Sequence, residues 1–331
     1  MTPLFGVWND FGRLREVAVG TMQGATVPGW LPRFRYIAPE LQEVIRRHAG
    51  APIVEIEELA GLVPTVQRQL DNLAATYERF GVIVHRPRLL SDVERQFLSS
   101  QQVGAIQLHP ADPIWIIGRH AIECQFHTPF RNKEVFPLRD LIRPLMDADP
   151  RARWVACPAS APVEGGGGAG PFLEGGDILI CGNARKDVLV GIDEERSSNA
   201  AGVEWLMRYL IDDGYRVTGV PITRDGPIHL TAVLGVAGPE RALVYRPSLV
   251  NGIPEQIRHW DFIDLTLDET RATGPCVVMI DPNTILVPAE TPRIVDELDK
   301  RGLDVVPVEV SAISRLDGGI RCATFVIRRD P

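Results

Sequence analysis

A strand, a tight turn and a second strand recur along this chain, and this repetition constrains its fold more than any other feature. Each hairpin is predicted from two short apolar runs separated by Gly, Pro, Asn or Asp, the residues that reverse a strand. The hairpins are expected at residues 113–124, 177–191, 230–245 and 276–287. Because they begin at similar intervals, we expect one structural unit that is repeated along the chain.

Amphipathic segments of helical period follow several of the hairpins and extend the unit. The clearest segments lie at residues 64–80, 198–213 and 292–301. The second begins after Ser197-Ser198-Asn199, a sequence typical of a helix cap. Single strands are expected next, at residues 82–85, 215–218 and 305–308. The order predicts a repeated strand–strand–helix–strand unit.

A fifth unit requires the two ends of the chain to pair. Residues 15–19 and 324–327 are both apolar and of strand character, and pairing them would close the array. We therefore expect a single closed, pseudo-symmetric α/β domain over residues 1–331 rather than two domains.

The composition excludes several classes of partner. A net charge of -8 argues against nucleic acid and anionic membranes, which select for clustered Lys and Arg. Residues 1–6 lack the basic and apolar regions of a secretory signal, and no apolar run approaches the ~20 residues that cross a bilayer. The five cysteines are scattered and form no CxxC pair, which disfavours a disulfide framework or a structural zinc site. We expect a cytoplasmic protein with reduced thiols and without a metal or organic cofactor.

Residues 165–170 form the one low-complexity stretch of the chain. This glycine-rich segment is either a linker or a loop over a site, since no change in composition separates its two sides. It is not a phosphate-binding loop, because no Lys-Ser/Thr follows it.

Two residues at strand starts could take part in covalent catalysis. Cys322 follows Gly318-Gly319, and adjacent glycines let backbone N–H groups approach a thiolate. Its other interpretation is a small buried apolar residue. His229, at a loop-to-strand junction, could be the general acid/base that such a mechanism requires, or a structural histidine.

Carboxylates stand before two of the predicted strands. Glu174 and Asp177 flank a Gly-Gly pair, so that one could face a pocket while the other caps the turn. Asp112 precedes Pro113 and could bind a cation or only begin a turn. Each of these signals is weak alone, and a purely structural role is an open alternative for each.

The order of these motifs resembles the guanidino-modifying enzymes of the pentein superfamily, and most closely the amidinotransferases that act on glycine or inosamine derivatives. The resemblance spans nearly the whole chain. It is carried by residues 7–20, Asp112 with its hairpin, residues 131–134, Glu174-Gly-Gly-Asp177, residues 202–206, His229 and the Gly-Gly-x-x-Cys322 motif.

The resemblance implies a fold and a set of roles. The fold is a five-bladed α/β propeller of pseudo-symmetric ββαβ units around a central active site. Cys322 would be the nucleophile, His229 the acid/base and Glu174 the carboxylate that orients the imidazole. Further residues are expected to bind substrate: Asp112, Asp177, Thr231, Arg131, Arg246, Arg321 and Gly319.

The chain departs from the family pattern at three positions. Thr231 stands where the family usually has a second guanidinium-binding Asp, Ala111 replaces an Arg, and Arg321 replaces a His. Losing one charged hydrogen bond at Thr231 would weaken binding by roughly 1.5–3 kcal/mol.

Three functions follow as hypotheses. The first is transfer of an amidino group from arginine or a similar guanidino donor to an amine acceptor, through an amidino-Cys322 intermediate. The second is hydrolysis of the arginine deiminase or dihydrolase type. The third is a non-catalytic pentein-like binding protein. The expected partners are small molecules, with a homodimer as a further expectation.

Overall fold

The computed structural model describes residues 5–31, 34–35, 37–161 and 168–331 as an α/β protein. Its strands are β1 (Leu14–Val19), β2 (Thr21–Thr26), β3 (Ile83–His85), β4 (Ala105–Gln107), β5 (Ile114–Ile117), β6 (His120–Glu123), β7 (Arg153–Ala156), β8 (Ile178–Ile180), β9 (Asp187–Ile192), β10 (Arg216–Pro221), β11 (Leu234–Val236), β12 (Arg241–Val244), β13 (Asp261–Asp264), β14 (Val278–Asp281), β15 (Thr284–Pro288), β16 (Asp304–Val308) and β17 (Thr324–Arg329). Its α-helices are α1 (Pro39–His48), α2 (Leu62–Arg79), α3 (Asp92–Gln96), α4 (Phe136–Asp147), α5 (Ala200–Leu210), α6 (Leu267–Arg271), α7 (Pro292–Asp299) and α8 (Ser311–Ser314).

Five three-stranded sheets share one construction. In each, two strands pair antiparallel and a third runs parallel to the middle strand. The strand orders are β17-β1-β3, β5-β6-β7, β8-β9-β10, β11-β12-β13 and β14-β15-β16. The repeated unit predicted from the sequence is therefore confirmed.

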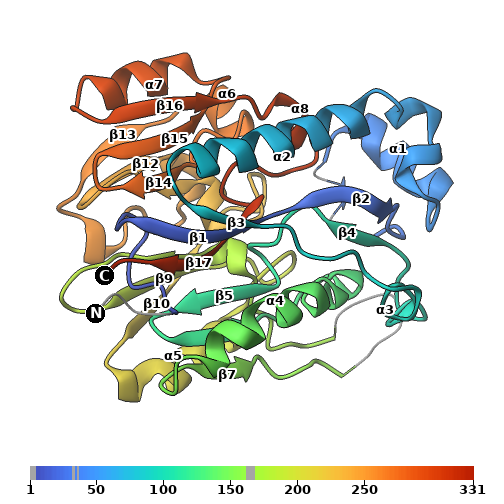
Figure 1. The fold of residues 1–331 in the computed structure, drawn as a ribbon, viewed down its shortest axis with the longest axis horizontal. Helices are drawn as coiled ribbons and strands as arrows, with labels where there is room; N and C mark the ends of the chain where they lie inside the picture. The colour runs from blue at the N-terminus through green and yellow to red at the C-terminus, as the bar shows by residue number, and fades with distance from the viewer. Residues whose placement is uncertain (1–4, 32–33, 36, 162–167) are drawn as a thin grey trace.

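The two ends of the chain complete the first sheet, as predicted. β1 and β17 pair antiparallel with Val17 opposite Val326 and Ala18 opposite Phe325. Figure 1 shows these strands in the middle of the molecule, between the sheets of β14–β16 and β5–β7. This pairing closes the array, so that all five sheets face one centre.

Helices between the second and third strands pack on the outside of four sheets. α2 buries Val66, Leu70, Leu73 and Tyr77, which recur at helical spacing and are fully buried. α5 begins after Asn199, whose side chain accepts a hydrogen bond from the N–H group of Gly202, which confirms the predicted cap.

Two details differ from the sequence-based expectation. The β12–β13 connection has short 3₁₀ turns at Arg246–Ser248 and Glu255–Ile257 in place of an α-helix, because Pro247 and Pro254 cannot continue one. Residues Leu230–Ala232 form a 3₁₀ turn rather than the start of β11, because the Leu230 N–H group donates to Asp177 instead of to a strand.

A further layer lies outside the five repeats. β2 pairs with β4, and α1 and α3 lie near this pair at one end of the molecule (Figure 1). Half of the glycine-rich stretch, residues 165–167, lies outside the described residues. Within the described ranges, none of the helices has the length and apolar character needed to span a membrane.

Candidate active site

The residues with reactive or charged side chains stand just before the first strand of successive sheets. Asp112 precedes β5, Asp177 precedes β8, and His229 precedes the 3₁₀ turn that leads into β11. Cys276 stands before β14 and Cys322 before β17, each by two residues. The pseudo-symmetry of the fold therefore brings five separate chain segments to the same end of the central strands.

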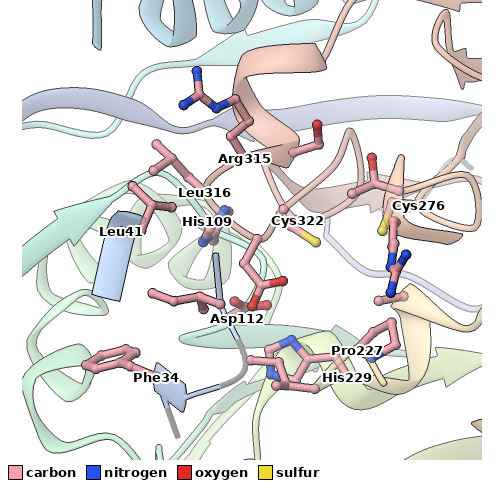
Figure 2. A pocket seen from close by; sticks show the side chains of 18 of the residues that line it. Phe34, Leu41, His109, Asp112, Pro227, His229, Cys276, Arg315, Leu316 and Cys322 are labelled. Carbon is pink, nitrogen blue, oxygen red and sulfur yellow. The ribbon is translucent and has the colours of Figure 1, made fainter. Parts of the chain in front are cut away.

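A pocket of about 680 Å³ opens at this end. Cys322, His229, Asp112, Cys276 and His109 all line it. Figure 2 shows these side chains around one space, with Cys322 between Cys276 and the side chains of His109 and Asp112. The fold thus places a thiol, an imidazole and a carboxylate where one small molecule can touch all three.

Glu174 holds His229 from behind the pocket. Nε2 of His229 donates to Oε2 of Glu174 over 2.8 Å, and both side chains are buried. Burial lowers the pKa of His229, but the hydrogen bond to Glu174 and the nearby carboxylate charges raise it to about 10. The imidazole is therefore protonated at neutral pH and can donate a proton.

Gly176 lets His229 approach the turn that carries Glu174. A Cβ atom at this glycine would lie 2.4 Å from Nδ1 of His229 and 2.9 Å from Oδ1 of Asp112. Gly176 therefore removes a steric block between the imidazole and the Asp112 carboxylate, whereas a Cβ atom at Gly175 would meet the Ala111 carbonyl oxygen at 2.1 Å.

Cys322 has the environment of a reactive thiol. A hydrogen bond from Cys276 lowers the pKa of Cys322, burial and the Asp112 charge oppose this, and the Gly319 N–H group and His229 also lower it. The net direction is downward, while the pKa of Cys276 is raised well above its usual value, first by its hydrogen bond to Cys322. The interaction between the two sulfur atoms thus favours a Cys322 thiolate, and the Cys276 Sγ atom also lies 3.7 Å from the Thr231 carbonyl oxygen, to which it can donate.

Asp112 is fixed through one oxygen and open at the other. Its Oδ2 accepts from Nη1 of Arg131 at 3.0 Å, and Arg131 also makes two 2.9 Å hydrogen bonds to Glu134. Oδ1 of Asp112 has no hydrogen-bond partner among the residues that the structure describes, although Asp112 is only 2% exposed. A buried carboxylate oxygen in this position is suited to a cationic N–H donor.

His109 is a second imidazole in the pocket. Burial lowers its pKa to about 4, so the ring is neutral at physiological pH. Its Nε2 atom has no hydrogen-bond partner within the described chain, and it lies 2.2 Å from where a Cβ atom on Gly318 would be. Gly318 is therefore required for the close packing of this ring against the loop before Cys322.

Several residues expected to bind substrate lie elsewhere. The hydroxyl group of Thr231 donates to the Gly176 carbonyl oxygen at 2.7 Å and does not line the pocket. Asp177 accepts hydrogen bonds from the backbone N–H groups of Ser198 and Leu230, so its carboxylate joins the two segments that carry these residues.

The three arginines differ in their positions. Arg131 lines the pocket, but its guanidinium is committed to carboxylates of the protein. Arg321 does not line the pocket; it pairs with Asp10 and lies over the Trp115 ring. Arg246 is half exposed and pairs with Asp264 outside the pocket. Gly319 contacts Cys322 through its N–H group rather than lining the pocket.

Sequence reasoning missed Cys276 and His109 as members of the site. Cys276 could have been predicted from its position, because it stands two residues before the first strand of a hairpin, β14, just as Asp112 stands two residues before β5. The signal for His109 was its position three residues before Asp112, in the same approach to β5. Among the described residues, no group of three or more His, Cys, Asp or Glu side chains is arranged to hold a metal ion.

Comparisons with known proteins support the fold. A family model described as arginine deiminase matches residues 263–329, which include Cys322. The L-arginine:L-lysine amidinotransferase of Pseudomonas savastanoi pv. phaseolicola is 22% identical, over 97% of this chain and 93% of that protein.

Solved structures agree over almost the full length. An amidinotransferase from the saxitoxin biosynthetic pathway of Microseira wollei superposes with a TM-score of 0.78 at 21% identity, covering 98% of this chain and 97% of that one. The dimethylarginine dimethylaminohydrolase of Pseudomonas aeruginosa gives a TM-score of 0.63 at 15% identity, with coverages of 95% and 99%. The chain therefore has the five-bladed pentein fold, and the resemblance to the amidinotransferases that its motifs predict is confirmed along nearly its whole length.

Proposed function

We propose that this chain is an amidinotransferase that moves an amidino group from arginine, or a similar guanidino donor, to an amine acceptor. One observation carries the proposal: Cys322, His229 and Asp112 line one pocket, and Glu174 holds the imidazole in a protonated state. The similarity to amidinotransferases over the full length of the chain supports transfer as the outcome.

The first step is capture of the guanidinium. Its N–H groups donate to Oδ1 of Asp112, while Arg131 keeps Oδ2 in place. Burial raises the pKa of Glu134 to about 7 despite its contact with Arg131. The group formed by Asp112, Arg131 and Glu134 therefore gains one net negative charge, which favours a cation, as Glu134 ionises above this pH. Localising the guanidinium charge on the side of Asp112 exposes the central carbon to attack.

The second step is covalent. The Cys322 thiolate attacks the guanidinium carbon and forms a C–S bond, giving a tetrahedral adduct. Glu174 occupies Nε2 of His229, so Nδ1 is left to deliver the proton to the departing amine. The C–N bond breaks, ornithine leaves, and an amidino group remains on Cys322.

The third step reverses the second with a new amine. The acceptor amine gives a proton to His229 and attacks the amidino carbon, a C–N bond forms, and the C–S bond breaks to release Cys322. Ping-pong kinetics follow, because the donor product leaves before the acceptor reacts.

The test is mass spectrometry of the Cys322 peptide after incubation with arginine. We expect an amidine adduct on Cys322, a burst of ornithine, and continued ornithine release only with an added amine. Cys322→Ala should form no adduct. Cys181→Ala is the matched control, because Cys181 is also buried but lies outside the pocket. Full turnover by Cys322→Ala would refute the proposal.

Hydrolysis is the second candidate, favoured by the match of residues 263–329 to the arginine deiminase model. Water attack on the amidino-Cys322 intermediate would release urea after ornithine. In the deiminase type, ammonia leaves Cys322 first and water then releases citrulline, whereas the dihydrolase type hydrolyses the guanidino group fully, to ornithine, ammonia and carbon dioxide. Ammonia or citrulline without an added amine therefore assigns hydrolysis.

A non-catalytic protein is tested separately: its Cys322 would react with a haloacetamidine no faster than free cysteine. Cytoplasmic location and a homodimer stay predictions.

A further inference from the structure

The pocket around Cys322 is larger and more apolar than a guanidino group requires. Its volume of about 680 Å³ is in the range of cavities that enclose drug-sized ligands. Away from the reactive side chains it has one apolar wall, which we call the apolar arm. The members that define it are Phe34, Leu41, Val44, Ile106, Phe130 and Leu316.

The apolar arm is built mostly by elements outside the five repeated units. Leu41 and Val44 come from α1, and Ile106 comes from β4, which lie together at one end of the molecule (Figure 1). Figure 2 shows Phe34, Leu41 and Leu316 on one side of the pocket, with His229 and Cys276 on the other. The arm is thus in the same pocket as the reactive thiol, and it adjoins a charged residue of that pocket, since Arg315 directly precedes Leu316 in the chain.

None of the cationic side chains of the pocket is itself one of the six apolar residues that define the arm. Arg131 is bound to Asp112 and Glu134. Arg271 and Arg315 line the pocket from α6 and from the segment after α8, both as exposed side chains. The charged head of an amino acid donor is better matched by these two residues, since the six members of the arm offer it no ionic partner.

We propose that the apolar arm holds the hydrophobic body of the acceptor, which is therefore a primary amine with an alkyl or aryl chain. This inference rests on the proposed amidino transfer. The amine nitrogen attacks the amidino carbon on Cys322, its proton passes to His229, and the chain attached to it extends over Leu41 and Phe34. Displacing water from apolar side chains is the source of the affinity.

The test is a series of straight-chain primary amines with arginine as donor. We expect kcat/KM for the amine to rise about fourfold for each added CH₂ group until the arm is filled. Amino alcohols of the same length should gain much less, because the terminal hydroxyl loses its hydrogen bonds to water.

Leu41→Gln tests the arm directly. Glutamine is as good a helix former as leucine, so α1 should persist, and Leu41 is only partly buried. We expect a flattened response to amine chain length, with adduct formation from arginine unchanged. Glu40→Gln is the matched control, since this neighbouring residue is exposed and does not line the pocket.

The outcomes separate this inference from the proposed function. A flat or falling response to chain length in the wild-type protein, with the Cys322 adduct still formed, overturns the inference alone. A weakened KM for arginine in Leu41→Gln with an unchanged amine series assigns the arm to the donor and also overturns it. If no adduct forms, the proposed transfer fails, and calorimetric titration of hexylamine against propylamine then tests the arm by itself. Equal affinities would refute it.

Discussion

Glu174→Gln is the most informative single change, because it keeps the shape of the side chain and removes its charge. Glu174 is fully buried, and its Oε2 atom accepts from Nε2 of His229 at 2.8 Å. A glutamine amide can still hydrogen-bond the ring but does not stabilise its positive charge. We expect the pKa of His229 to fall and the pH profile of adduct formation to change with it.

The size of the effect follows from the charges around the ring. The pKa of His229 is raised from 6.5 to about 10 despite burial. This net rise corresponds to about 5 kcal/mol at 1.36 kcal/mol per pKa unit. Three carboxylates produce it, namely Glu174, Asp112 and Asp177, and Glu174 is the one joined to the ring by a hydrogen bond. Its removal should therefore lower the pKa by at least about one unit.

The assay is single-turnover formation of the Cys322 adduct, quenched and measured from pH 6 to pH 10. We expect the alkaline limb to move down by at least about one pH unit, so that the rate at pH 10 falls by roughly fivefold or more while the rate at pH 7 changes less. His85→Gln is the matched control. His85 makes a similar 2.7 Å contact with Glu16, but outside the pocket, so its loss should leave adduct formation intact. An unchanged pH profile in Glu174→Gln would refute the reasoning.

The same pair makes folding stability depend on pH. The folded-state pKa of His229 is above its unfolded value, so the stabilisation is complete below about pH 6.5 and is lost as pH rises toward about 10. The free energy of unfolding should decrease through this window by up to about 1.4 kcal/mol per pH unit. Urea titrations should show a smaller decrease over the same window in Glu174→Gln.

Three other predictions concern neighbours of the site. Cys276→Ala should raise the pKa of Cys322 and lower its rate of alkylation at pH 7, because the interaction with Cys276 that lowers this pKa is lost; an unchanged rate would contradict this. Arg131→Met should destabilise the fold by roughly 3–5 kcal/mol, measured by urea unfolding, because buried carboxylates lose their counter-ion; a change under 1 kcal/mol would contradict this. Arg246→Ala should leave the KM for arginine unchanged, because its side chain pairs with Asp264 and does not line the pocket; a tenfold increase in KM would contradict this.

The sequence by itself determined the repeating architecture and the order of the reactive residues. Hairpins and helices are short-range features, and their apolar periodicity and turn residues are visible within about 20 residues. The closure of the array through β1 and β17 was also predictable, because the repeat lacked one unit and both ends had strand character. Motif order then indicated Cys322, His229, Glu174 and Asp112.

Only the tertiary structure decided which side chains meet. The spacing of Arg131 and Arg246 gave no indication that one fixes Asp112 and the other pairs with Asp264 at the surface. Cys276 was one of five scattered cysteines until the pseudo-symmetry placed it beside Cys322. The apolar arm joins residues from α1, β4 and the loop before Cys322, which are far apart along the chain. Contacts of this kind depend on side-chain direction and chain closure, and local sequence patterns encode neither.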